Sequence, residues 1–313
     1  MSDFGIILAC YQRDYSFVKG CCASIRYFLG EVPICLIVDG TFSTADLQKT
    51  YGVKTIYRSQ VPQAVLRDKK YTSSTKMIAF WESPWETFLY LDADMVVWGD
   101  LLKFSDFENY DIIIDRHRFI HSEIEVKKWF FDGQRLETFF PDYQWRDRRY
   151  FCTGVFFGKR GLFDLKEYER LIELKINNPT LFYGMDQGLL NLMIFRAADQ
   201  EKLRLGFETL QIIVPDFSRE HLEKTYPIGS EGPSNLSQTA PLAIHWSGKK
   251  PFISRSSVYP EPMNFFRRRF LSDSGSNNQV VNQAKLQIED FNVYRHKLLK
   301  RVTTGRSTSM LRS

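Results

Sequence analysis

The stretch Glu86–Leu101, ETFLYLDADMVVWGDL, sets the expected fold, because an apolar run leads directly into two aspartates one residue apart. We predict a buried parallel strand over Thr87–Leu91, since the run is apolar, short and abruptly ended. Ligands of an open α/β sheet bind beyond the carboxyl ends of its strands, so Asp92 and Asp94 are expected at the ligand edge. Side chains two residues apart on an extended backbone point the same way. The pair therefore predicts an oxygen-rich site suited to Mg²⁺ or Mn²⁺.

Other interpretations of the aspartate pair have to be weighed. A solvated turn would explain a lone Asp-x-Asp, but the position directly after a predicted central strand favours a site. A helix-loop-helix calcium site is excluded, because Val96 and Val97 stand where an oxygen ligand and a glycine are needed. A phosphatase of the haloacid dehalogenase type stays open, since LDADMVV resembles its strand and Asp-x-Asp motif. That motif belongs on a first strand, however, whereas Asp92 follows three strand-helix units.

Strands and helices alternate through the first third of the chain. This alternation predicts right-handed βαβ units, and hence an α/β fold with a mostly parallel central sheet flanked by helices. A first strand that leads into Cys10-Tyr11-Gln12-Arg13-Asp14 lacks the glycine-rich phosphate loop of a sugar-nucleotide pyrophosphorylase. The periodic patterns predict strands over 4–9, 34–38 and 54–58, and helices over 16–29, 44–51 and 74–81.

The second half of the chain is less regular. Residues 115–150 are crowded with aromatic and charged residues, and we interpret them as an insertion that covers the acceptor site or as a solvated loop. The expected division is one elaborated domain over 1–262, a basic helical extension over 263–301 and a disordered tail over 302–313. Further strands are predicted over 110–115, 150–158 and 242–245, helices over 165–177, 184–196 and 280–299, and a flexible loop over 227–241.

Composition and cysteine usage limit the class of protein. The 313 residues are 43% hydrophobic and 15% aromatic, which is enough for a large core. No apolar run reaches the roughly 18 residues of a membrane-spanning helix, and the opening Met1-Ser2-Asp3 shows no export signal. The five cysteines are odd in number and lack zinc spacing. We therefore expect a cytoplasmic protein with reduced thiols.

The positive charge is concentrated at the C-terminus. The whole chain has 42 Lys and Arg against 37 Asp and Glu, but six of the basic residues and no acidic ones follow Asp290. The preceding part is nearly neutral, which argues against nucleic acid as a partner. The tail and the cluster 265–270, FFRRRF, raise the hypothesis of peripheral attachment to the inner face of an anionic membrane, with a solvated helix face as the alternative.

Three distant motifs accompany the aspartate pair: FCTGVFFG from Phe151, YGMDQGLLN from Tyr183 and IHWSGKKPF from Ile244. Together with LYLDADMVVWGDL they resemble glycosyltransferase family 8, the retaining enzymes that include glycogenin and bacterial lipopolysaccharide galactosyltransferases. The resemblance runs from residue 4 to about residue 253. It implies a GT-A fold, a UDP-sugar donor, a divalent cation that is commonly Mn²⁺, and transfer of a hexose to a glycan, lipid or protein acceptor.

The resemblance also implies roles for individual residues. Asp92, Asp94 and His245 would hold the metal, and Asp186 and Gln187 would reach the sugar, where oxygen atoms stabilise an oxocarbenium-like transition state. Taken alone, Asp186 would be a helix N-cap and His245 a structural histidine. The residues implied for donor binding are Tyr15 on the base, Arg67, Lys76, Ala93 and Thr153 around the donor, and Gly248, Lys249 and Lys250 on the phosphates.

Two departures from the family pattern bear on activity. Cys152 stands where the family usually has a sugar-contacting Asn, so a catalytically inactive protein that binds nucleotide sugars is an alternative. The segment from His245 to Pro251 is one residue shorter than usual, which leaves open whether Lys249 or Lys250 contacts phosphate.

Overall fold

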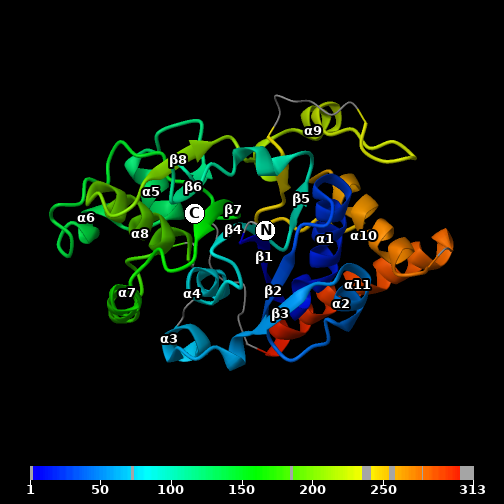
Figure 1. Ribbon diagram of the computed structural model, residues 1–313, viewed down its shortest axis with the longest axis horizontal. Helices are drawn as coiled ribbons and strands as arrows, with labels where there is room; N and C mark the ends of the chain where they lie inside the picture. The colour runs from blue at the N-terminus through cyan, green and yellow to red at the C-terminus, as the bar shows by residue number, and fades with distance from the viewer. Residues whose placement is uncertain are drawn as a thin grey trace.

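A computed structural model of the chain describes residues 3–71, 74–183, 186–234, 241–253, 258–276 and 278–303. Its central sheet has seven strands in the order β3-β2-β1-β4-β7-β6-β8 (Figure 1). Only β7 runs antiparallel to its neighbours, so the sheet is mostly parallel, as predicted. The strands are β1 (Phe4–Tyr11), β2 (Ile34–Asp39), β3 (Lys54–Tyr57), β4 (Thr87–Asp92), β6 (Ile112–Asp115), β7 (Val155–Lys159) and β8 (Leu205–Glu208).

A second sheet of three short strands lies at the carboxyl end of β4. Its order is β5-β10-β9, with β5 (Met95–Val97), β9 (Gln211–Ile213) and β10 (Ala243–His245). In the antiparallel pairing of β10 with β5, His245 is the partner of Met95. The sequence patterns predicted β10 but neither β5 nor β9. This small sheet brings residues 211 and 245 next to the aspartate pair.

Helices cover both faces of the central sheet, because alternate side chains of its strands are buried on each side. In β1, Ile6 and Leu8 enter one core and Ile7 enters the other. The first core includes helix α1 and, from the C-terminal part of the chain, helix α10; α5, α7 and α8 contribute to the second (Figure 1). The helices are α1 (Tyr15–Leu29), α2 (Ala45–Tyr51), α3 (Ala64–Arg67), α4 (Ala79–Glu82), α5 (Glu123–Trp129), α6 (Gly133–Leu136), α7 (Leu165–Asn177), α8 (Gln187–Asp199), α9 (Arg219–Thr225), α10 (Glu261–Asp273) and α11 (Gln279–Thr303).

Several predicted elements differ from the structure at their ends. The strand expected over 150–158 begins only at Val155, because the backbone of Phe151 is hydrogen-bonded to the Asn191 side chain instead of to a neighbouring strand. The helix expected over 74–81 is a 3₁₀ turn, Thr75–Ile78, followed by α4. Of the helix expected over 184–196, residues 184 and 185 lie outside the described residues, as do 235–240 of the predicted loop and most of the predicted tail.

The segment 115–150 contains α5 and α6 and is packed through its aromatic rings. Phe131 and Tyr150 are fully buried, and Gly133 lies so close under the Trp145 ring that a Cβ atom there would be 2.4 Å from it. Trp129 and Phe119 remain exposed, at 50% and 71% of their surface. The segment is therefore anchored to the second core while it presents aromatic side chains to solvent.

The cluster 265–270 does not expose its rings as the membrane hypothesis requires. Phe266 and Phe270 are buried in the first core, and Arg267 is 1% exposed. The Arg267 guanidinium lies 2.8 Å from an Asp290 oxygen and 3.3 Å from a Glu289 oxygen, both on α11. The premise of an exposed aromatic and basic patch is therefore wrong. Among the described residues, no helix combines the length and apolarity needed to cross a bilayer.

We expect His121, in the segment 115–150, to make the protein sensitive to acid. Burial lowers the pKa of His121 to about 4, and His117, whose ring centroid is 4.2 Å away, adds to this effect. Between an unfolded-state pKa of 6.5 and about 4, the unfolded chain binds a proton that the folded chain does not, so stability falls as the pH is lowered. We expect His121→Phe to flatten the dependence of Tm on pH in this window. The exposed His221, changed to Phe, is the control, and equal slopes in the wild type and His121→Phe would contradict the prediction.

Candidate active site

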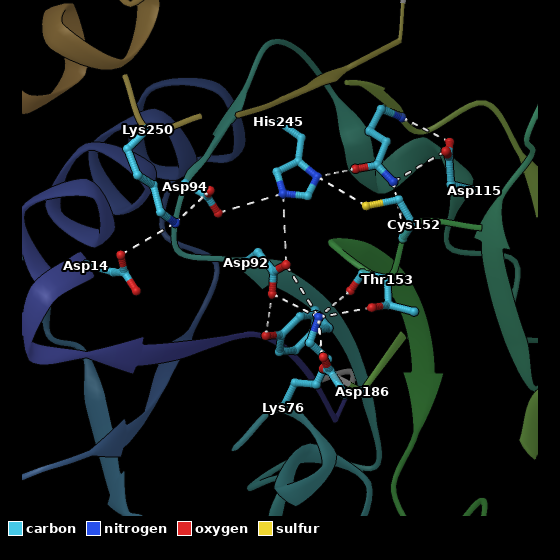
Figure 2. A network of polar contacts seen from close by, with 12 residues as sticks. Asp14, Lys76, Asp92, Asp94, Asp115, Cys152, Thr153, Asp186, His245 and Lys250 are labelled. Carbon is cyan, nitrogen blue, oxygen red and sulfur yellow. Dashed lines mark hydrogen bonds and ion pairs between the residues drawn. The ribbon is translucent and has the colours of Figure 1, made fainter. Parts of the chain in front are cut away.

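Asp92, Asp94 and His245 converge at the carboxyl edge of the central sheet (Figure 2). Asp92 ends β4, and Asp94 lies in the turn from β4 to β5. β10 pairs with β5, and the Trp246 amide continues this contact by donating to the Asp94 carbonyl at 3.2 Å. One potential ligand atom from each of the three side chains lies within 4.8 Å of the others. Strand pairing thus assembles a group whose members lie as many as 153 residues apart in the sequence, from 92 to 245.

The donor set fits a divalent cation. The Nε2 atom of His245 lies 3.7 Å from an Asp94 oxygen and 3.9 Å from an Asp92 oxygen, while Nδ1 lies 2.9 Å from the Gln211 Oε1 atom. Burial lowers the pKa of His245 although both carboxylates oppose this, so the imidazole is favoured in its neutral form. The two carboxylates offer the oxygen ligands that Mg²⁺ and Mn²⁺ prefer, and the neutral imidazole offers a nitrogen ligand.

Lys250 is the basic residue of the C-terminal motif that reaches this group. Its Nζ atom lies 2.8 Å from an Asp94 oxygen and 3.4 Å from an Asp14 oxygen. Burial acts to raise the pKa of Asp94, but the Lys250 ammonium outweighs it and holds that pKa below its ordinary value. Lys249 is exposed. Gly248 has a φ of 76°, a left-handed backbone conformation that glycine adopts more easily than other residues. Of the two lysines, Lys250 is therefore the one placed at the aspartates.

Lys76 links the aspartate pair to Asp186. Its buried ammonium lies 3.1 Å from an Asp92 oxygen and 3.4 Å from an Asp186 oxygen. It also donates to the carbonyl and hydroxyl oxygens of Thr153, at 2.9 and 3.1 Å. Burial acts to lower the pKa of Lys76, but Asp186 and Asp92 outweigh it and raise that pKa, so the lysine stays charged. Three acidic or basic groups predicted from separate motifs therefore form one network.

Asp186 is positioned at the start of α8 without capping it. Its side chain makes no cap hydrogen bond and instead accepts from the Ser74 hydroxyl at 2.8 Å. The helix itself is held close: a Cβ atom at Gly188 would lie 2.0 Å from the Phe130 carbonyl oxygen, and Gln187 donates to the Trp129 carbonyl at 3.4 Å. The interpretation of Asp186 as an N-cap residue explains its position but not its side chain, which points into the network (Figure 2).

Two predicted donor-site residues do not join this network. Tyr15 donates its hydroxyl to Asp46 and packs its ring edge against Phe42. Arg67 is half-exposed and donates to the carbonyls of Val61 and Pro62. Ala93, which the resemblance also implies for donor binding, is buried and stands between Asp92 and Asp94 in the sequence.

A further buried basic residue near this edge is Arg58, which the sequence patterns did not single out. Arg58 lies 2.9 Å from an oxygen of Asp39, at the carboxyl end of β2. Thr75 donates its hydroxyl to the same Asp39 oxygen at 2.8 Å, and Lys69 reaches the other oxygen at 3.0 Å. The position of Asp39 directly after a predicted strand was the signal that could have identified this cluster.

Cys152 lies beside His245, where the family resemblance expects an Asn. Its sulfur is 3.7 Å from His245 Nδ1, and burial raises the pKa of the thiol to about 12, so it is neutral. Its carbonyl oxygen accepts from Gln211 Nε2 at 2.8 Å.

Because Gly154 has no side chain, the His245 ring can lie directly against its backbone. A Cβ atom at position 154 would lie 2.4 Å from Cε1 and 2.6 Å from Nδ1 of His245. We expect Gly154→Ala to displace the imidazole and to weaken Mn²⁺ binding by roughly 10-fold or more, the effect typical of a lost ligand orientation. Calorimetric titration measures this, with Gly229→Ala as a control because a Cβ there meets only an ordinary contact at 3.7 Å. Unchanged affinity in Gly154→Ala would show that the ring position is unimportant for binding.

The chain matches no protein-family model and no curated protein sequence. Solved structures match it over most of its length. The galactosyltransferase LgtC, in complex with donor and acceptor sugar analogues, aligns at a TM-score of 0.50 and 13% identity, covering 87% of this chain and 95% of LgtC. The apo bifunctional glycosyltransferase WbbM aligns at a TM-score of 0.53 and 11% identity over 93% of this chain and 52% of its own. GlyE of Streptococcus pneumoniae TIGR4 aligns at 0.50 and 14% identity over 95% and 64%.

These similarities establish the fold. Identities this low carry no activity from one protein to another. The chain has the GT-A fold of glycosyltransferases, which confirms the predicted α/β class with a mostly parallel sheet flanked by helices.

Proposed function

We propose that this protein is a metal-dependent retaining glycosyltransferase, similar to family 8, that moves a hexose from a UDP-sugar to a glycan, lipid or protein acceptor. The observation that carries the proposal is the joining of Asp92, Asp94 and His245 to Asp186 through the buried Lys76 ammonium. A metal group alone would fit many functions. A metal-binding group joined to a third carboxylate, Asp186 at the start of α8, on a GT-A fold, fits donor cleavage.

The chemistry of donor cleavage requires both halves of the network. The diphosphate leaving group develops negative charge, which a Mn²⁺ or Mg²⁺ ion held by Asp92, Asp94 and His245 would neutralise when bound. Lys250, which lies against Asp94, would add positive charge on the same side. The sugar develops positive charge at its anomeric carbon, which the Asp186 carboxylate and the Gln187 amide oxygen would stabilise. The negative charge of the leaving group and the positive charge of the sugar would thus each face groups that stabilise it.

A nucleotide-sugar-binding protein without turnover is the second candidate. Cys152 favours it, because a thiol near His245 replaces the Asn expected from the resemblance. The phosphatase alternative is set aside, since it expects Asp-x-Asp after the first strand and Asp92 ends β4 of a sheet that matches glycosyltransferase structures.

A panel of nucleotide sugars tests both candidates. Binding to the native state raises Tm, so we expect UDP-sugars to raise it when Mn²⁺ is present and much less in EDTA. Release of UDP from the donor then separates turnover from binding. UDP release that is lost in Asp186→Asn, with donor binding retained, supports transfer. Donor binding without UDP release, with any acceptor class offered, would favour the binding protein, and no Tm shift with any nucleotide sugar would contradict both candidates.

A further inference from the structure

Three buried polar side chains form a chain that ends at the His245 imidazole: Asp115, Gln211 and His245 (Figure 2). They are 6%, 6% and 3% exposed, and they lie at the end of β6, the start of β9 and the end of β10. Among the hydrogen bonds and ion pairs of the described residues, none joins Asp115 or Gln211 to Asp92 or Asp94. The contacts of Asp115 and Gln211 instead determine where the proton of His245 is held.

The orientation of the Gln211 amide follows from its two acceptors. The Asp115 carboxylate accepts the backbone N–H groups of Leu210 and Gln211 on Oδ1, at 2.9 and 3.1 Å. Its Oδ2 accepts the Gln211 Nε2 group at 3.3 Å, and the Cys152 carbonyl accepts Nε2 at 2.8 Å. Burial raises the pKa of Asp115 to about 6, so its carboxylate is ionised at neutral pH, and neither an ionised carboxylate nor a carbonyl has a hydrogen to donate. The NH₂ end of Gln211 must therefore face them, and the amide cannot be reversed without losing both bonds.

This orientation selects one tautomer of His245. The Gln211 Oε1 atom can only accept a hydrogen bond, so the Nδ1 atom 2.9 Å away must donate one. A neutral imidazole carries one N–H, so Nε2 has a lone pair, and Nε2 is the atom that faces Asp94 and Asp92. Without this constraint the two carboxylates would attract the proton to Nε2, where it would block ligation.

We propose that Asp115 and Gln211 are positioning residues that hold His245 in its Nδ1-protonated tautomer and so keep Nε2 available as a ligand for a divalent cation. The part of this inference that concerns the cation rests on the proposed function. The part that concerns the tautomer does not, because it depends only on hydrogen bonds within the protein.

A single substitution should reverse the arrangement. In Asp115→Asn, the remaining carbonyl oxygen can still accept from Leu210 and Gln211, but the introduced NH₂ group then faces the Gln211 NH₂ group. Turning the Gln211 amide relieves this conflict at the cost of its bond to the Cys152 carbonyl. The turned amide presents NH₂ to His245 Nδ1 and drives the proton to Nε2. In the double variant Asp115→Asn with Gln211→Glu, the introduced carboxylate accepts both from the new amide at position 115 and from Nδ1. The original tautomer therefore returns with the same total charge.

Nitrogen NMR of histidine-labelled, metal-free protein reads the tautomer directly. The five histidines are distinguished by a His245→Asn sample, which lacks the signal of interest. We expect Nδ1–H in the wild type, Nε2–H in Asp115→Asn and Nδ1–H again in the double variant. Mn²⁺ titration should show affinity reduced by roughly 10- to 100-fold in Asp115→Asn and largely recovered in the double variant. Glu208→Gln, at the end of the neighbouring β8, is the control and should change neither measurement.

The outcomes separate this inference from the proposed function. An Nε2–H tautomer or an imidazolium in the neutral-pH wild type would overturn it, even if Asp115→Asn failed to fold. An unchanged tautomer in a folded Asp115→Asn would overturn it as well. If the wild type showed Nδ1–H, and Asp115→Asn reversed it, but neither bound Mn²⁺, the tautomer control would stand and the metal-dependent function would fail.

Discussion

Asp94→Asn is expected to abolish metal-dependent UDP release while the protein remains folded. The substitution removes a ligand charge from the buried group of Asp92, Asp94 and His245 and the partner of Lys250. A loss of about 4 kcal/mol of charge stabilisation corresponds to a decrease in kcat/KM of roughly 10³-fold. Initial rates over a Mn²⁺ titration measure this, and circular dichroism checks the fold. Added Mn²⁺ should restore little activity, because the ligand itself is altered.

Asp100→Asn is the matched control, since Asp100 is exposed and lies shortly after β5, outside the network. It should retain wild-type kcat/KM. Full activity of Asp94→Asn, or wild-type activity that survives removal of all divalent ions, would be incompatible with the metal site.

Lys76→Met is expected to lower the free energy of unfolding by about 3 kcal/mol, the scale typical of removing one partner from a buried ion pair. The Lys76 ammonium is the common partner of Asp92 and Asp186, whose side chains are 26% and 15% exposed. Methionine fills a similar volume but leaves two carboxylates facing each other without a cation. Urea denaturation measures the change through the midpoint at an unchanged slope.

The origin of that loss can be checked by removing one of the charges. Lys76→Met combined with Asp186→Asn should be more stable than Lys76→Met alone, because it relieves the repulsion. Lys49→Met, at an exposed position of α2, is the control and should have little effect. A Lys76→Met protein as stable as the wild type would mean that the buried cation is not needed to hold the carboxylates together.

Six of the seven strands of the central sheet, all except β8, and the aspartate pair could be predicted from the sequence because their signals are local. The run before Asp92 is apolar and short, and the strand and the placement of Asp92 follow from it alone. The strands β5 and β9 have only three residues each, too few for a periodic pattern, and they exist through their pairing with β10. The Asp115–Gln211–His245 chain depends on that pairing and has no signal along the sequence.

Two predictions that involve basic residues depend on packing that has no signal along the chain. The family resemblance implied Arg67 for donor binding, and this stays a prediction; the structure buries Arg58 beside Asp39 and leaves Arg67 partly exposed beside Asp68. For the cluster 265–270, the adjacent aromatic and basic residues suggested an exposed surface that attaches to a membrane. Phe266 and Phe270 are four residues apart and therefore lie on one helical face, which packs into the first core.

The position of Asp290 gives helix α11 a role in shaping the edge of the sheet where the candidate site lies. Its Oδ2 atom accepts the backbone N–H of Ile253 at 2.8 Å, three residues after Lys250, while Glu289 accepts from Ser16 and Lys19 on α1. The expected domain boundary at residue 262 falls inside α10. A protein shortened at that boundary would lose the hydrogen-bond partners of α1 and of the loop that carries Lys250. Deletion of the C-terminal helices should therefore impair donor affinity, whether or not it also changes localisation.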